Sequence, residues 1–340
     1  MSQYRRILVV RRDNIGDLVL TTPLIHALRQ RFPAAWIGAL TNGYNAPVLA
    51  GNPDLNGIYA YDKAKHRPDR SRLGAAAGTA RLLLDLRRLR VDLAIIAAPG
   101  HQRQASNLVR WIAAGQVLGF AAPGGDRRIT LPIAYGDGAA LHAAEDVFRL
   151  LAPLGVQGGP GPCRMTVDPQ ALAAMRARLA GARRPLVALH ISARRARQQW
   201  PAQRFAEVIA ALNRSGAAVM LLWAPGATDD PRHPGDDAKA QAVRELAGAA
   251  ATLIPVPTTS LPELAAALAC ADLMVCADGG AMHVAAAVGT PVVAMFGDSP
   301  PHRWHPWGVS HRVVAAPGGD MAHLEAVPVI DAAQALLPAD

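Results

Sequence analysis

The strongest constraint on the fold of this chain is a strand–glycine turn–helix pattern that occurs near both of its ends. Near the C-terminus, the segment Asp278–His283 contains a glycine pair and stands between two strongly apolar runs. Near the N-terminus, the apolar run 6–10 leads through Asn14-Ile15-Gly16-Asp17 into apolar residues at helical spacing. Two such units, far apart in the sequence, indicate two similar domains, each with a ligand-binding edge.

The same alternation of strand and helix patterns continues between the two ends. It runs to about residue 154, is interrupted by the glycine- and proline-rich segment 157–162, and restarts at residue 185. The predicted strands cover 5–10, 36–40, 91–97, 185–190, 218–223 and 252–256; the predicted helices begin near 17, with a bend at Pro23, and cover 73–90, 141–154, 236–248 and 261–269. Alternation of this kind is typical of parallel sheets with helices on both faces, where ligands bind beyond the carboxyl ends of the strands.

We therefore predict an α/β protein with two Rossmann-like domains whose loops border one central cleft. A chain of 340 residues exceeds the comfortable size of a single core. The predicted domains are 1–160 and 165–325, followed by a C-terminal helix within 326–340 that packs back on the first domain.

The charge of the chain indicates anionic partners. The formal net charge is +9, and the segment 61–90 holds nine Lys and Arg against three acids. Such a patch attracts phosphates, whether on nucleic acid, on anionic lipid or on a phosphorylated glycan. A solvated loop and helix face is the alternative reading of the same residues.

Cysteine content and hydropathy predict a cytoplasmic protein. The three cysteines have neither metal nor redox spacing, which fits a reducing compartment. No signal peptide is visible, and no segment approaches the roughly 20 apolar residues of a membrane-spanning helix. We expect a cytoplasmic protein that can rest on the inner face of the membrane.

Several kinds of chemistry are disfavoured by missing motifs. The chain has no G-x-G-x-x-G after its first strand, no P-loop and no D-x-D pair of the kind that holds a divalent metal. His283, His302 and His305 fit no standard zinc spacing, so we read them as structural or surface residues. We accordingly predict neither a metal site nor a cofactor.

The remaining polar residues suit a diphosphate. Glycines at a strand-to-helix turn let an anion approach the backbone N–H groups and the positive end of the helix dipole. Arg194, Arg195 and Arg197 follow the strand that ends at His190, and guanidinium groups pair well with phosphate. Asp17 admits two readings, a general base or a helix N-cap.

These motifs resemble those of the family-9 glycosyltransferases, the lipopolysaccharide heptosyltransferases. The resemblance rests on 7–10 with 14–17 and 22–24, on 278–287 continuing through 289–291 to 296–297, on 199–201 and on 304–308. It implies a GT-B fold and inverting, metal-independent transfer of a heptose from ADP-heptose to the inner core of lipopolysaccharide. Two departures concern the donor: Gly279 stands where the family usually has Ser or Thr, and Gln198 stands where it usually has Lys, with Arg197 adjacent.

The resemblance implies roles for Asp17, Ser192, Asp278, Gly280 and His283, and the charge and position of the other polar residues suggest theirs. Asp17 matches the catalytic base. The expected donor-binding residues are Ser192, Arg194, Arg195, Arg197, Gln198, Asp278, Gly279, Gly280 and His283, and the expected acceptor-binding residues are Asn14, Gly16, Lys63, Lys65 and Arg67.

The implied partners are a nucleotide sugar, a lipid A–Kdo or core oligosaccharide acceptor and an anionic membrane surface, with no nucleic acid because few aromatic residues interleave the basic patch. The open alternatives are a GT-B enzyme with another nucleotide sugar, an epimerase, and a non-catalytic nucleotide-sugar or anionic-glycan binding protein.

Overall fold

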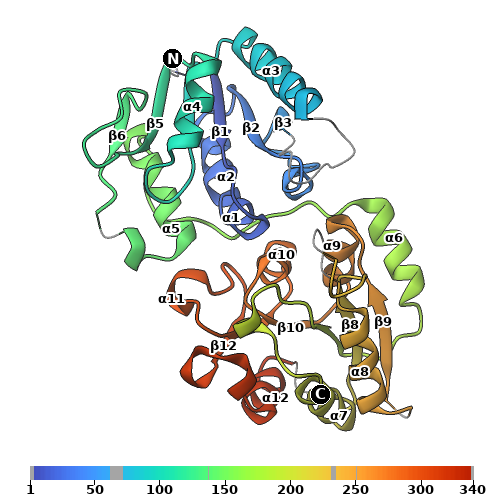
Figure 1. Ribbon diagram of the computed structural model, residues 1–340. Helices are drawn as coiled ribbons and strands as arrows, with labels where there is room; N and C mark the ends of the chain where they lie inside the picture. The colour runs from blue at the N-terminus through green and yellow to red at the C-terminus, as the bar shows by residue number, and fades with distance from the viewer. Residues whose placement is uncertain (1–3, 62–71, 137, 231–234, 250, 338–340) are drawn as a thin grey trace. The chain divides into compact units, whose positions relative to one another are not determined.

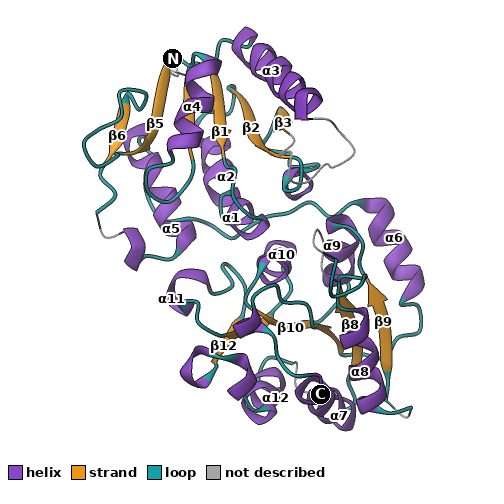
Figure 2. Ribbon diagram, in the orientation of Figure 1, coloured by secondary structure: helices purple, strands orange, loops and turns teal. Residues whose placement is uncertain are grey.

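A computed structural model describes residues 4–61, 72–136, 138–230, 235–249 and 251–337 of the chain (Figure 1). Its contacts divide the protein into two compact units, 1–166 and 167–340. The division lies close to the glycine- and proline-rich segment that suggested a boundary. Each unit is an α/β layer structure (Figure 2).

The first unit is built on a six-stranded sheet in which all neighbouring strands run parallel. The strand order is β3-β2-β1-β4-β5-β6. The strands are β1 (Arg6–Val10), β2 (Trp36–Asn42), β3 (Gly57–Tyr61), β4 (Leu93–Ile96), β5 (Gln116–Phe120) and β6 (Leu131–Ile133). The helices are α1 (Ile15–Val19), α2 (Thr22–Arg31), α3 (Arg72–Arg88), α4 (Arg103–Ile112) and α5 (Ala143–Phe148), with 3-10 turns η1 (Ala46–Leu49), η3 (Gly138–Ala140) and η4 (Arg149–Leu154).

The second unit repeats this plan with the order β12-β11-β10-β7-β8-β9, again parallel throughout. Its strands are β7 (Leu186–His190), β8 (Ala218–Trp223), β9 (Leu253–Pro257), β10 (Leu273–Ala277), β11 (Val292–Phe296) and β12 (His311–Ala315). Its helices are α6 (Pro169–Arg178), α7 (Ala202–Arg214), α8 (Asp237–Ala247), α9 (Leu261–Ala269), α10 (Gly280–Val288), α11 (Pro301–Trp304) and α12 (Ala326–Gln334), with 3-10 turns η5 (Ala196–Gln198), η6 (Pro317–Gly319) and η7 (Met321–His323).

Both sheets therefore have the doubly wound order in which the first strand of the unit lies next to the fourth. The central strands β1, β4, β7 and β10 are almost wholly buried because helices cover both faces. The loops after β1 and β4 in one unit, and after β7 and β10 in the other, leave the carboxyl edge at the point where the strand order reverses. Ligands bind at this point in open α/β sheets.

Two sequence expectations differ from the structure. The helix expected to start near Asp17 and bend at Pro23 is two helices, because α1 ends at Val19 and α2 starts at Thr22. Pro23 occupies the first turn of α2, where its missing N–H costs no hydrogen bond. The predicted helix 141–154 becomes 3-10 from Arg149 onward, and Pro153 lies within that stretch.

The C-terminal helix was expected to pack on the first domain. In the structure, α12 packs on α7, β11 and β12 of its own unit. Its buried residues Ala326, Val329 and Ala333 belong to the core of the second unit together with Trp200 and Phe205. The buried face of this helix is thus used within the second unit.

Among the described residues, no helix combines the length and the apolar character that crossing a bilayer requires.

Candidate active site

Asp17 lies at the carboxyl edge of the first sheet, in the first turn of α1. Its Oδ1 accepts a hydrogen bond from Arg11 Nη2 at 2.7 Å, and its Oδ2 accepts from the backbone N of Asn14 at 3.0 Å. The Asn14 side-chain amide lies 3.2 Å from the same oxygen. Asp17 is only 12% exposed. These donors fix the orientation of the carboxylate, while Oδ1, which accepts from a single donor, keeps a further lone pair.

The N-cap reading of Asp17 is wrong, because Asn14 occupies the N-cap of α1. Asp17 is the third helical residue, and its carboxylate accepts from the N-cap backbone as in a capping box. The residue thus stabilises the start of α1 and also presents a carboxylate at the sheet edge. Gly16, also expected to touch the acceptor, is buried in the same turn.

A buried arginine and two asparagines hold the rest of this loop. Arg11 is 2% exposed, pairs with Asp13 at 3.1 Å as well as with Asp17, and donates to the Ala97 carbonyl at the end of β4. The side-chain amides of Asn42 and Asn45 donate to the Asp13 carbonyl oxygen. Arg11 was not among the residues expected in the site, although its position directly after a buried strand was an available signal.

At the matching position of the second unit, only Asp278 and Gly279 separate β10 from α10. Gly279 is the N-cap and has an extended backbone, with φ 169°, so it caps the helix with no side chain. The first N–H groups of α10 have no partner within the helix. This is the geometry predicted for an anion-binding turn starting at Gly280.

Gln198 joins the loop after β7 to this turn. Its side-chain amide donates to Asp278 Oδ2 at 3.2 Å and to Ser299 Oγ at 3.1 Å, and the residue is buried. Trp200, also buried, donates from Nε1 to the Leu324 carbonyl at 2.8 Å and so anchors the end of the loop in the core. The structure thus brings together Gln198 and Asp278, both expected to bind the donor, and adds Ser299, which was not among the expected residues.

The three arginines of this loop, Arg194, Arg195 and Arg197, are exposed. No ion pair is found for them within the described parts of the chain. The backbone of the loop is packed closely: a Cβ on Gly297, directly after β11, would lie 2.7 Å from the Arg197 carbonyl oxygen. Glycine at this position therefore permits the loop to cross the end of β11.

Ser192 lies apart from this cluster, beside β8. Its hydroxyl oxygen accepts from the backbone N of Ala224 at 3.0 Å, which leaves its proton available to a ligand. Lys239 of α8 donates to the neighbouring Ile191 carbonyl at 3.0 Å. Burial, with a smaller contribution from the nearby charge of Lys239, lowers the pKa of His190 to about 4, so that the histidine at the end of β7 is neutral at pH 7.

His283 lies in the first turn of α10 and is buried. Its ring contacts that of Trp304 edge to face, with centroids 6.4 Å apart. Lys63, Lys65 and Arg67, assigned to the acceptor, lie outside the described residues. In the described part of the chain, no group of three or more His, Cys, Asp or Glu side chains is arranged to hold a metal ion. Metal independence stays a prediction.

A groove of about 880 Å³ lies within the first unit, between α4 and the loop that joins β5 to β6. Four arginines line it, with one acid: Arg103, Arg110, Arg127, Arg128 and Asp126. Burial opposes ionisation of Asp126, but hydrogen bonds from His101, the Arg128 backbone and Ser106 and the charge of Arg128 prevail and lower its pKa to about 2. Because Asp126 pairs with His101 and Arg128, the groove keeps an excess of positive charge suited to an anion.

Helix α4, which forms one side of the groove, also contacts the loop after β1. His101, which lines the groove, follows β4, and Arg12 Nη1 donates to Gln104 Oε1 of α4 at 3.2 Å. The acceptor-binding cations were expected in 61–90, and these arginines were not, although Asp126-Arg127-Arg128 follows a Gly-Gly turn.

Comparison with known proteins identifies the family of this chain. The sequence model of glycosyltransferase family 9 (heptosyltransferase) matches residues 80–331 of this chain. Lipopolysaccharide heptosyltransferase 3 of Escherichia coli (strain K12) is 29% identical over 306 residues, which cover 86% of this chain and 82% of that protein.

Two solved structures share the fold. The glycosyl transferase family 9 structure from Veillonella parvula DSM 2008 superposes with a TM-score of 0.84 at 22% identity, over 98% of this chain and 97% of that one. The structure of E. coli heptosyltransferase WaaC with ADP superposes with a TM-score of 0.78 at 20% identity, over 97% of this chain and 99% of that one. The predicted GT-B fold is confirmed, and the central cleft stays a prediction. Because the family match spans most of the chain and includes the β10–α10 turn, this protein belongs to glycosyltransferase family 9 and is a heptosyltransferase-like glycosyltransferase.

Proposed function

We propose that this protein transfers a heptose from ADP-heptose to the inner core of lipopolysaccharide, with inversion at the anomeric carbon and without a metal ion. The observation that carries the proposal is Asp17, a carboxylate held by Arg11 and Asn14 at the reversal point of the first sheet. The names of the relatives, lipopolysaccharide heptosyltransferase 3 and WaaC with ADP, support the choice of substrates.

In the proposed reaction, a hydroxyl of the acceptor donates to a remaining lone pair of Asp17. Its oxygen attacks the anomeric carbon from the side opposite the diphosphate, the new glycosidic C–O bond forms, and the bond to the leaving oxygen breaks. The proton passes to Asp17, and ADP departs with the electron pair of the broken bond. Attack from the opposite side inverts the configuration.

The leaving diphosphate gains negative charge, which the second unit is equipped to stabilise. The first N–H groups of α10 supply fixed dipoles, and Arg194, Arg195 and Arg197 supply charge. Gln198 stands where the family usually has a lysine, but it is neutral and hydrogen-bonded to Asp278 and Ser299. The positive charge of that lysine is therefore supplied by the three arginines of the same loop.

We assign the acceptor to the first unit. An inner-core acceptor carries phosphates and carboxylates, and the groove beside α4 offers four arginines, while α4 itself also contacts Arg12, in the loop of Asp17. Neutralising Arg103 and Arg127 together (R103Q/R127Q) should raise the KM for the acceptor about tenfold or more and leave the KM for the donor unchanged. Arg312→Gln, an exposed arginine of β12, is the matched control.

The test of the donor is a thermal-shift screen with ADP, UDP, GDP and dTDP. At about 100 times its Kd, the preferred nucleotide stabilises the protein by about 2.7 kcal/mol, which is several degrees in Tm. We expect ADP to give the largest shift, and a larger shift with UDP would contradict the ADP donor. Release of ADP from ADP-heptose that requires the acceptor would support transfer, whereas binding without release would indicate a non-catalytic protein.

A further inference from the structure

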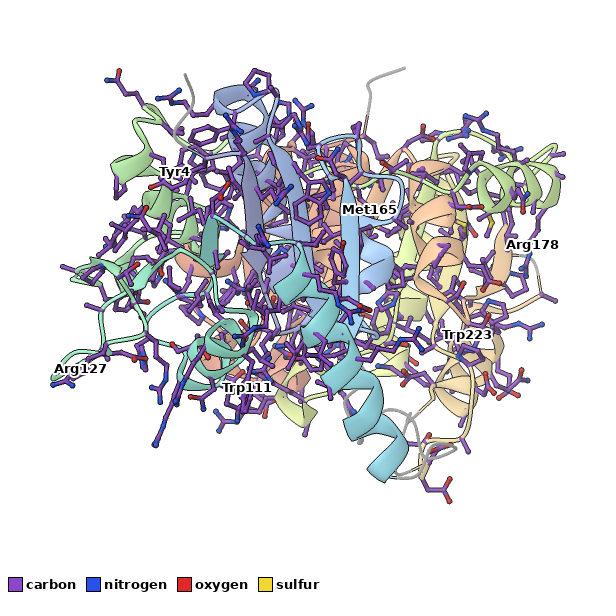
Figure 3. All side chains as sticks on the ribbon, turned by 90° about the horizontal axis from the view of Figure 1, so that it is seen from above. Tyr4, Trp111, Arg127, Met165, Arg178 and Trp223 are labelled. Carbon is purple, nitrogen blue, oxygen red and sulfur yellow. The ribbon has the colours of Figure 1, made fainter. Side chains whose placement is uncertain are left out.

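The outer surface of α3 and α4 carries two large apolar side chains in solvent. Trp111, near the end of α4, is 67% exposed, and Leu84 of α3 is 56% exposed. The two helices pack against each other, and Arg87 Nη1 of α3 donates to the Trp111 carbonyl at 3.5 Å. Figure 3 shows Trp111 on the side of the first unit that α3 also covers. Leu84 is one helical turn before Arg87, so Leu84 and Trp111 lie on adjoining parts of one surface.

The hydrophobic core beneath this surface is complete without Trp111 and Leu84. The neighbouring Leu86 and Ile112 are buried and complete the core on this face of the sheet. Trp111 and Leu84 also lie outside the lining of the acceptor groove. Single exposed apolar residues are ordinary, but a tryptophan and a leucine on adjoining helices form a small apolar patch of the kind found at interaction sites.

The charges around this patch identify the chemistry of the partner. We define the α3/α4 surface by Leu84, Trp111 and the exposed arginines around them, which are Arg81, Arg87, Arg88, Arg90 and Arg110; of these, Arg110 also lines the acceptor groove and borders both surfaces. Asp85 pairs with Arg88 at 3.0 Å, and the ion pairs of the described residues include none for the other four. Five arginines with one acid leave a strong positive excess, which favours an anionic partner.

We infer that the α3/α4 surface docks the protein on an anionic lipid membrane, with Trp111 and Leu84 at the level of the headgroups and the arginines against lipid phosphates. Tryptophan prefers the interface between water and hydrocarbon because its ring is apolar while its N–H remains solvated. Arginines beside an inserted apolar residue add electrostatic attraction to anionic lipid. A second copy of this chain is a poor partner, because each copy carries a formal charge of +9.

The experiment is co-sedimentation of the full-length protein with vesicles of phosphatidylcholine, with or without about 30% phosphatidylglycerol. Wild type should bind the anionic vesicles and bind neutral ones weakly. Trp111→Ser should lower the partition coefficient about tenfold and Leu84→Ser about fivefold. Arg87→Gln and Arg88→Gln should each lower it about fivefold. The matched control is Leu246→Ser, which removes a leucine 51% exposed on α8 of the second unit and should change nothing.

A second readout places Trp111 in the lipid. Brominated phosphatidylcholine quenches tryptophans that enter the bilayer, and the chain contains six. Wild type should lose part of its emission on binding. Trp111→Phe, which keeps an apolar ring, should bind the same vesicles within about twofold and lose that quenching.

The inference is overturned if Trp111→Ser binds like wild type, if Leu246→Ser weakens binding equally, or if neutral vesicles bind as well as anionic ones. It is also overturned if wild type binds no vesicle and Trp111→Ser instead changes the oligomeric state in sedimentation, which would make the surface a protein interface. Unchanged melting curves confirm that the exposed substitutions leave the fold intact.

Discussion

The loop after β1 and the turn after β10 occupy equivalent edges of two sheets with the same strand order, yet they are built in opposite ways. Around Asp17, a buried arginine and an asparagine hold one carboxylate with three donors. Around Gly279, the helix starts with no side-chain cap, and the nearby Arg194 and Arg195 extend into solvent.

The difference matches what each step of the proposed reaction needs. A general base must be held within hydrogen-bond distance of one proton, so a carboxylate with a fixed orientation suits this role. A diphosphate is large and highly charged, so backbone N–H groups and long arginines can bind it after it arrives. One scaffold therefore supplies two kinds of site through its loops alone.

The largest expected effect is a loss of stability when the loop after β1, which we call the rigid loop, loses Arg11. Arg11→Met removes the guanidinium that pairs with Asp13 and Asp17 and leaves the partly buried Asp17 without its cation. We expect the free energy of unfolding, measured by urea denaturation, to fall by about 3–5 kcal/mol. The control Arg88→Met breaks an exposed pair and should cost less than about 1 kcal/mol. Equal losses in both variants would contradict the rigid-loop description.

Asp17→Asn separates the structural from the chemical role of the same residue. The amide oxygen of Asn still accepts from the Asn14 backbone, but it takes no proton from the acceptor. We expect turnover to fall about 100-fold or more, equivalent to about 2.7 kcal/mol, with donor binding unchanged. Asp13→Asn also loses an ion pair with Arg11 and should stay within about fivefold of wild type. Full activity of Asp17→Asn would remove the residue from catalysis.

In the second unit, pH should act through His190. Its folded pKa, about 4, is depressed, so its neutral form contributes stability that is present above the unfolded value of about 6.5 and is lost as pH falls toward 4. As the pH falls from 7.5 to 5, this histidine should lower the free energy of unfolding by about 2 kcal/mol. Denaturation curves of His190→Asn over the same range should show a shallower decline, and an identical decline would refute the assignment.

Gly297→Ala tests whether the arginine loop is held by its close crossing of β11. The new methyl would lie 2.7 Å from the Arg197 carbonyl oxygen, so the backbone must move. We expect ADP affinity, measured by calorimetry, to fall about tenfold. Gly159→Ala, which places its methyl in open space, is the control. Unchanged affinity would mean that the position of the loop does not matter.

The smallest expected effect is an increase in ADP affinity. Gly279 has an extended backbone, and a Cβ there would meet only the Ala277 carbonyl at 4.0 Å, so a serine fits without strain. One hydroxyl close to the helix start should raise ADP affinity about two- to tenfold, while Gly279→Ala should raise it little. Equal affinities of the serine and alanine variants would show that this turn does not contact the nucleotide.

Local patterns were read from the sequence most reliably. The helix 261–269 was predicted with its observed bounds, and Ser260 Oγ accepts from the Glu263 backbone at its start. The strand 218–223 was predicted with its observed bounds. In both cases the signal lies within a few neighbouring residues, where propensity and capping act directly.

The region between β4 and α5 was not assigned from the sequence. It contains β6, whose three residues Leu131–Ile133 include a proline, a combination that patterns describe poorly although the edge of a sheet tolerates it. The basic groove was missed for the same reason: its arginines come from α4 and from the β5–β6 loop and meet only once both are packed.

The order of residues alone specified two α/β halves with polar loops after their first strands, because hydrophobic periodicity and glycine turns are local properties. Folding in three dimensions decided which of those polar groups act together. Arg11 reaches Asp17, Gln198 reaches Asp278 across 80 positions, and Gly297 admits the Arg197 backbone. Such partnerships depend on which strands become neighbours and on how closely backbones approach, and neither quantity is encoded in any short stretch of chain.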